Sequence, residues 1–173
     1  MARYLVELVQ RYFMCKSYAV RVAVPIPYRK RVGGSERIFH QFIDILAISP
    51  RETVIVECRD FKSVKRVRDS IHRLLRLFKR SLAYLESNGY RVDRAILVVD
   101  DKDLEKIEPY LSILSSENVY VLKLSEILKE LVECSLKEEE YRKLRGEGDT
   151  ILAIIRVLYR YLKNSKDVYE SHH

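Results

Sequence analysis

A chain of 173 residues, 47% hydrophobic and 33% charged, is long enough for one globular domain with a substantial core. No apolar run reaches the length of a membrane span, and Glu7, Gln10 and Arg11 interrupt the N-terminal one, which argues against a signal peptide; we therefore expect an intracellular, cytoplasmic protein. The net charge of +7 predicts attraction to polyanions, and the many Lys, Arg and Glu residues are typical of thermophilic proteins.

The first quarter of the chain predicts a helix followed by a strand and a hairpin tip. Apolar residues recur at helical spacing over 2–17 and give one buried face. Residues 18–26 are rich in valine and predict a strand closed by Pro25 and Pro27, which fit a strand end or an edge strand but not a central strand. The next segment, 28–35, contains two glycines and predicts a hairpin tip. Three consecutive cations in it are candidate phosphate contacts: Arg29, Lys30 and Arg31.

Two apolar stretches then predict adjacent strands, over 39–48 and 53–59, joined by a turn at 49–52. Charge interrupts these strands at three positions: Asp44, Glu57 and Arg59. Because side chains alternate along a strand, Glu57 and Arg59 point one way and Cys58 points the other way. A carboxylate buried in an apolar strand is costly unless it is paired or binds a metal. Two such carboxylates on neighbouring strands, with a cation beside the second, indicate a divalent-metal site. The alternative is that Glu57 and Arg59 mark the solvated end of a strand and that Asp44 pairs with a nearby lysine.

The stretch 63–87 predicts a long amphipathic helix with Ser63 as its N-cap. Its polar face is dense in cations, and Asp69 is the only acid between Lys62 and Arg80. A solvated face normally mixes both signs, so this one predicts an anionic partner, of which nucleic-acid backbone is the simplest. The candidate phosphate contacts on it are Lys65, Arg66, Arg73, Arg76, Lys79 and Arg80. The alternatives are an acidic protein, or the chain's own segment 137–141 with its three glutamates.

The second half predicts two strand–helix alternations, and hence parallel pairing on that side of the sheet. The expected elements are a strand over 93–99, a helix over 104–115 capped by Asp100 or Asp101, and a strand over 119–124.

The C-terminal part predicts helices only. One begins at Ser125 and is expected to break and restart at Ser135, and a second, amphipathic one covers 149–163. These helices are expected to pack on the domain or to form a homodimer interface. The expected organisation is a core over 1–124, a helical extension of the same domain over 125–164, and a tail over 165–173 whose last residues match the start of a purification tag.

Asp44, twelve intervening residues and then Glu57-Cys58-Arg59 resemble the core motif of the PD-(D/E)XK nuclease superfamily, which includes archaeal Holliday-junction resolvases and Mrr-type restriction endonucleases. The resemblance covers roughly residues 2–99. It implies an α/β fold: a restriction-endonuclease-like αβββαβ core with a mixed central sheet flanked by helices, here with extra C-terminal helices. The main departure is Arg59, which stands where the family has its lysine. No proline precedes Asp44 either.

The resemblance implies metal-dependent cleavage of DNA phosphodiesters, with Mg²⁺ or Mn²⁺ as cofactor. It implies Asp44 and Glu57 as metal ligands, the backbone carbonyl of Cys58 as a third, and Glu7 of the first helix as a candidate fourth. Arg59 would take the electrostatic part of the lysine's role, and Lys62 is a candidate for a relocated ammonium.

Two other classes of function fit the same residues. A catalytically inactive DNA-binding module with this fold is favoured by Arg59 and opposed by the two retained acids. A structural protein could instead use the basic helix to bind an acidic partner. The chain contains no glycine-rich phosphate loop, no C-x-x-C pair and no Ser/His/Asp or Cys/His set that would point to other chemistry.

Overall fold

The computed structural model describes residues 3–61, 66–142 and 154. The chain divides into two compact units, Met1–Ser125 and Glu126–His173. None of the described helices combines the length and the apolarity that a membrane span requires.

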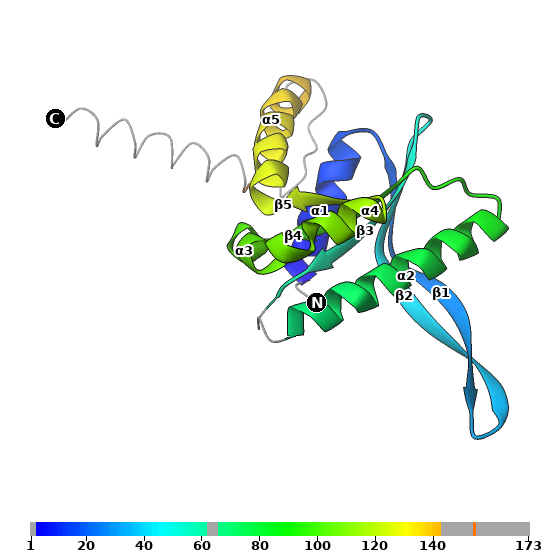
Figure 1. Cartoon of the computed structure of the whole chain (residues 1–173). Coiled ribbons are helices and arrows are strands. Elements are labelled where there is room, and N and C mark those ends of the chain that lie inside the picture. Colours follow the sequence, from blue (N-terminus) through cyan, green and yellow to red (C-terminus); the bar gives the residue numbers. More distant parts are fainter. Residues whose placement is uncertain (1–2, 62–65, 143–153, 155–173) are drawn as a thin grey trace. The chain divides into compact units, whose positions relative to one another are not determined.

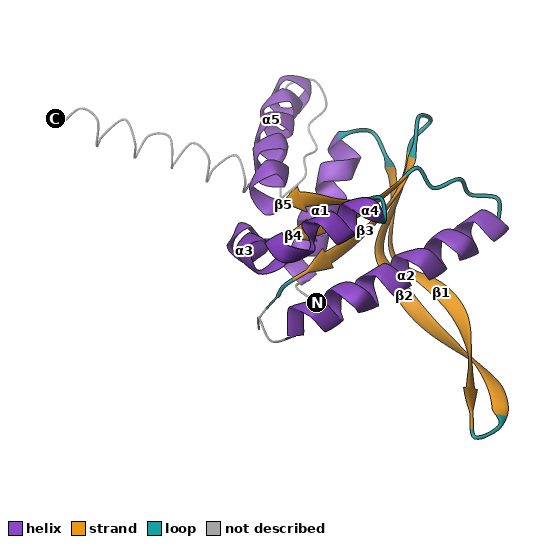
Figure 2. Ribbon diagram, viewed as in Figure 1, coloured by secondary structure: helices purple, strands orange, loops and turns teal. Residues whose placement is uncertain are grey.

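The first unit is built on one mixed sheet of five strands in the order β1-β2-β3-β4-β5 (Figure 2). The strands are β1 (Ala19–Val32), β2 (Ser35–Ile48), β3 (Thr53–Arg59), β4 (Arg94–Val99) and β5 (Val119–Lys123). β1, β2 and β3 pair antiparallel, whereas β3, β4 and β5 pair parallel. The parallel side confirms the pairing expected from the strand–helix alternation.

Helices cover both faces of this sheet. They are α1 (Arg3–Cys15), α2 (Val67–Ser87), α3 (Leu104–Ile107) and α4 (Leu111–Ser116). Leu97 of β4 belongs to the buried cluster that includes the apolar stripe of α2, and its neighbour Ile96, which points the other way, faces α1 (Figure 1). The order helix, three strands, helix, strand confirms the predicted α/β fold and its αβββαβ arrangement.

β1 is longer than the sequence predicts, because it continues through Pro25 and Pro27 as far as Val32. β1 is an edge strand, so the missing proline N–H groups can face away from the ladder to β2 without leaving a hydrogen bond unmade. Only Gly33 and Gly34 form the turn, with φ of +58° and +82°, the positive values that a two-residue hairpin turn of this type requires. The expected tip is therefore the end of a long two-stranded arm.

Two helix predictions need correction. The expected helix over 104–115 is interrupted by a 3₁₀ turn at Glu108–Tyr110, because Pro109 has no N–H for the helical ladder. α5 (Leu124–Arg142) continues through Ser135 without a break, and the Ser135 hydroxyl donates to the Val132 carbonyl at 2.7 Å. α2 begins at Val67 without a side-chain cap. Ser63 and the helix expected over 149–163 lie outside the described residues.

Candidate metal centre and nucleic-acid interface

Asp44 and Glu57 face each other at the end of the β2–β3 ladder. The last backbone pair is Ile45 with Val56, so the same register makes Asp44 and Glu57 the next pair. Their carboxylates replace the backbone pairing: the Asp44 N–H donates to Glu57 Oε1 at 3.1 Å, and the Cys58 N–H donates to Asp44 Oδ2 at 2.8 Å. Each acid is only 1% exposed. The two carboxyl groups are therefore locked side by side within the sheet.

The remaining two carboxylate oxygens differ in their surroundings. Glu57 Oε2 accepts a hydrogen bond from Arg59 Nη2 at 2.6 Å, which confirms that these two side chains point the same way. Asp44 Oδ1 is buried and accepts no hydrogen bond from any described residue. A buried carboxylate oxygen without a donor is unfavourable, and a bound cation would relieve it.

Burial disfavours the ionised form of both acids, and repulsion from Asp44 adds to this effect at Glu57. Burial raises the pKa of Asp44, against the opposing effects of the Cys58 N–H and the Arg59 charge. Burial, and then the nearby charge of Asp44, raise the pKa of Glu57 to about 8. Arg59, which contacts Glu57, thus does not compensate for two buried negative charges. The pair is short of positive charge, which is the condition that favours a divalent ion.

The strand on the other side of Asp44 is distorted at the matching position. The β1–β2 register places Ala23 opposite Asp44, but no backbone pair forms between them, while Val22 with Ile45 and Val24 with Ile43 do pair. Ala23 has φ of +54°, a left-handed conformation that is unfavourable for a residue with a Cβ. Strained backbone of this kind concentrates at functional sites. Asp44 therefore lies at an interruption of both of its ladders.

The chain leaving β3 is anchored by a pair of residues that sequence reasoning missed. Asp103 is fully buried, and its Oδ2 accepts a hydrogen bond from the Phe61 N–H at 2.8 Å. Lys106 Nζ contacts Asp103 Oδ1 at 2.5 Å and donates to the Phe61 carbonyl at 2.7 Å. Asp103 follows Asp100 and Asp101. One acid is enough to cap a helix, so the presence of three was the sequence signal that could have pointed to Asp103.

The other candidates for this site are Glu7, the Cys58 carbonyl and Lys62. Glu7 is exposed on α1, and the part of the chain that the structure describes contains no group of three metal-ligating side chains. Glu7 as a further ligand stays a prediction. An extended residue projects its N–H and C=O toward the same neighbouring strand, so the Cys58 carbonyl lies on the Asp44 side and stays a candidate ligand. Lys62 lies outside the described residues.

A basic surface runs along the solvent side of α2. Arg66, Arg73 and Arg76 are exposed and line an open depression of about 650 Å³ together with Asp69 and His72. Neither Arg66 nor Arg76 forms an ion pair with a described residue, whereas Arg73 Nε donates to the Asp69 carbonyl at 3.2 Å. Lys65 lies outside the described residues.

The last two expected cations of α2 are already engaged. Lys79 pairs with Glu117 at 2.8 Å. Arg80 donates to Gln41 Oε1 at 3.2 Å and lies over the Tyr28 ring at 4.8 Å, which joins α2 to the β1–β2 arm. Lys79 is therefore a weaker candidate phosphate contact than Arg66 or Arg76.

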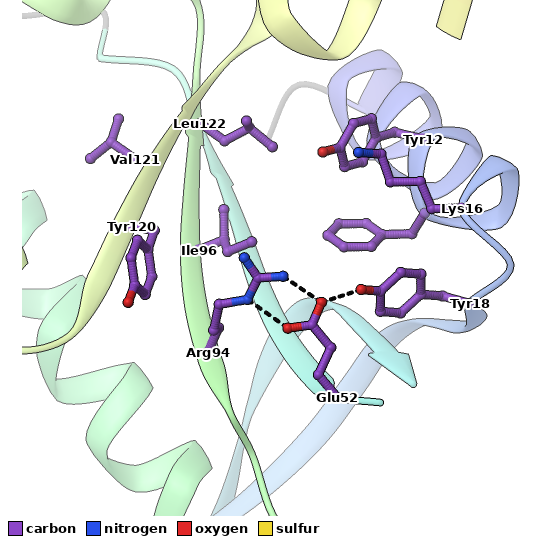
Figure 3. A pocket seen from close by; sticks show the side chains of 10 residues that line it. Tyr12, Lys16, Tyr18, Glu52, Arg94, Ile96, Tyr120, Val121 and Leu122 are labelled. Carbon is purple, nitrogen blue, oxygen red and sulfur yellow. Dashed lines mark hydrogen bonds and ion pairs between the residues drawn. The ribbon is translucent and has the colours of Figure 1, made fainter. Parts of the chain in front are cut away.

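A separate cavity of about 480 Å³ lies at the other end of β3 (Figure 3). Glu52, just before β3, accepts hydrogen bonds from Arg94 Nε at 2.7 Å, from Arg94 Nη2 and from the Tyr18 hydroxyl. Tyr12 of α1 and Tyr120 of β5 also line the cavity. The Glu52 carboxylate is paired with the Arg94 guanidinium. Among its described residues, this cavity therefore has no uncompensated negative charge of the kind found at Asp44 and Glu57.

Comparison with known proteins adds one weak similarity. The sequence matches no protein-family model and no curated protein. Among solved structures, the fold is similar to the crystal structure of an XisH family protein from Nostoc punctiforme PCC 73102, with 17% sequence identity and a TM-score of 0.48. The alignment covers 73% of this chain and 93% of that one.

Proposed function

We propose that this protein is a metal-dependent DNA endonuclease that hydrolyses phosphodiester bonds. The observation that carries the proposal is the buried Asp44–Glu57 pair, in which Asp44 Oδ1 accepts no hydrogen bond from a described residue and Glu57 is bound by Arg59. Apolar residues of similar volume in place of buried charges are often equally or more stable. Stability therefore does not explain two adjacent buried carboxylates, whereas a binding role does.

Asp44, Glu57 and the Cys58 carbonyl would hold the ion, because Mg²⁺ prefers oxygen ligands and keeps room in its shell for water and phosphate. When bound, the ion supplies charge stabilisation for the phosphate and lowers the pKa of the attacking water. Glu57 must release its proton for the site to bind a cation, so binding is expected to weaken below the Glu57 pKa of about 8.

Arg59 would orient Glu57 through the hydrogen bond at 2.6 Å and place positive charge where the phosphate gains negative charge. A guanidinium stays protonated in proteins, so Arg59 does not take a proton from the attacking water. The open arginine-lined depression on α2 would bind the DNA backbone, and this contact carries affinity without sequence preference.

The proposal is tested by incubating DNA with the protein and Mg²⁺ or Mn²⁺, and by comparing Asp44→Asn and Glu57→Gln with the surface control Glu117→Gln. We expect cleavage by the wild type and the control only. Manganese binding, followed by electron paramagnetic resonance, should be lost in the same two variants. Cleavage that survives both substitutions would place the active site elsewhere.

A catalytically inactive DNA-binding protein is the second candidate, and one observation favours it. Arg59 replaces the family's lysine and is already bound to Glu57, while the described residues offer no third side-chain ligand. On this alternative, the wild type binds DNA with a steep salt dependence and cleaves no duplex, junction, flap or single strand with either ion. Such an outcome would decide for the binding protein.

A further inference from the structure

The β1–β2 hairpin extends past the helices as a two-stranded arm (Figure 2). Its root is packed: Ile26 and Ile43 are fully buried. Farther out, the Tyr28 and Phe39 rings stack at 5.8 Å, and Arg80 of α2 covers Tyr28. Beyond this clamp every residue from Arg29 to Ile38 is exposed. The arm is thus fixed at its base and free of packing contacts at its end.

The end of the arm is basic, and its cations lie on both of its faces. Residues 29–38 contain four cations and one acid, Glu36, a net charge of +3. The register pairs Lys30 with Arg37, and Arg31 with Glu36 one position further out. Neighbouring pairs project to opposite faces, so Lys30 and Arg37 lie on one face while Arg31 lies on the other with Arg29. Arg29 alone is partly neutralised, by Glu36 at 3.4 Å.

Cations on two opposite faces do not suit a flat anionic surface, which would leave one face unpaired. They suit a groove with phosphates on both walls. The major groove of B-DNA is about 12 Å wide and admits a two-stranded ribbon, whose thickness with side chains is about 10 Å. The deep, narrow major groove of double-stranded RNA does not admit one.

We propose that the arm inserts into the major groove of duplex DNA, so that the substrate of the proposed nuclease contains a duplex segment beside the cleaved bond. This inference rests on the proposed function for the identity of the substrate. The insertion of the arm into a DNA groove does not depend on that function. Arg37 is seven residues from Asp44 along β2, which at about 3.4 Å per residue is about 24 Å. At a rise of about 3.4 Å per base pair, the arm reaches about seven base pairs from the metal site.

The test compares Lys30→Ala/Arg31→Ala with the control Arg21→Ala/Arg51→Ala. Both pairs are exposed and lack described side-chain partners, and both variants lose the same charge, but the control pair lies outside residues 29–38 and outside α2. Binding is measured without divalent ions on a duplex of about 20 base pairs, a hairpin-capped duplex shorter than the reach of the arm, single-stranded DNA and double-stranded RNA.

We expect the arm variant to lower the salt slope on the long duplex by about two units, one for each lost phosphate contact, with no comparable change on the other three nucleic acids or in the control. Wild type should also protect guanine N7 from methylation in the long duplex, and the arm variant should not, because N7 lies in the major groove. Equal losses on all nucleic acids, or no methylation protection, would overturn the inference. Absence of cleavage with Mg²⁺ would instead contradict the proposed nuclease and leave these binding results to decide the role of the arm.

Discussion

Replacing Glu57 by glutamine should change how the stability of the metal-free protein depends on pH. Burial raises the pKa of Glu57 from 4.5 to about 8. Between these values the unfolded chain has released the proton that the folded chain retains, so the free energy of unfolding falls as pH rises. Above about pH 8 Glu57 is ionised in the folded protein, and the free energy of unfolding is then lower than at acidic pH.

The size of the effect follows from the same shift. At about 1.4 kcal/mol per pKa unit, the penalty is about 3 kcal/mol at pH 7 and at most about 5 kcal/mol above the folded pKa. A glutamine amide can still accept the Asp44 N–H but cannot form the ion pair with Arg59. The charge of Arg59 acts against burial and already enters the Glu57 pKa of about 8, so losing that ion pair adds no further penalty. The variant should therefore be more stable than the wild type at neutral pH.

The measurement is urea unfolding between about pH 5 and about pH 8, in the presence of a chelator. The wild type should lose stability across this range, and Glu57→Gln should lose less, because only the raised pKa of Asp44 then remains at the pair. Glu52→Gln is the contrasting control: hydrogen bonds from Arg94 lower the pKa of Glu52, so its stabilisation is fully present above 4.5 and is lost only as pH falls further. Glu52→Gln should therefore be less stable than the wild type by a constant free energy across the range. Parallel profiles for wild type and Glu57→Gln would refute the assignment of the raised pKa.

Three further outcomes are expected. Asp44→Asn should abolish manganese binding measured by calorimetry. It should also raise the melting temperature of the metal-free protein, because it removes a buried carboxylate whose Oδ1 accepts no hydrogen bond from a described residue. Unchanged binding would exclude Asp44 as a ligand. Arg73→Ala/Arg76→Ala should reduce the salt slope of DNA binding by about two units on unrelated sequences, and an unchanged slope would move the interface away from α2. Arg59→Ala should abolish cleavage with little loss of DNA affinity, whereas Arg59→Lys should keep or raise it; cleavage by the alanine variant would remove Arg59 from the reaction.

The features that the sequence predicted correctly depend on local patterns. Ser49 and Pro50 mark a tight turn, and the alternation around Glu57 and Arg59 placed both side chains on one side, as the 2.6 Å contact confirms. The parallel side of the sheet followed from strand–helix alternation. These signals extend over a few residues each, which is the range over which periodicity and turn chemistry act.

The features that were missed depend on partners far along the chain. Glu52 looked like an ordinary turn residue, but its partners Tyr18 and Arg94 are 34 and 42 residues away. Asp103 lies just after the expected helix caps Asp100 and Asp101, and its partner Phe61 is 42 residues away. Pro25 and Pro27 fitted either a strand end or an edge strand, and only the order of the strands shows that β1 lies at an edge. The charge deficit at Asp44 likewise became visible only once the donors to each oxygen were known.

The order of the strands also bears on how the molecule reaches its folded state. Every strand pairs only with its neighbours in the sequence, from β1 to β5, so the sheet can grow one strand at a time as the chain leaves the ribosome. Contacts between near neighbours form fast because little chain entropy is lost in closing them. Asp44 and Glu57 can meet once β3 pairs with β2, a step that needs neither β4 nor β5. Burial is the main cause of their raised pKa values, so the cost of the two acids arises as the helices cover this part of the sheet, and a bound cation would offset it.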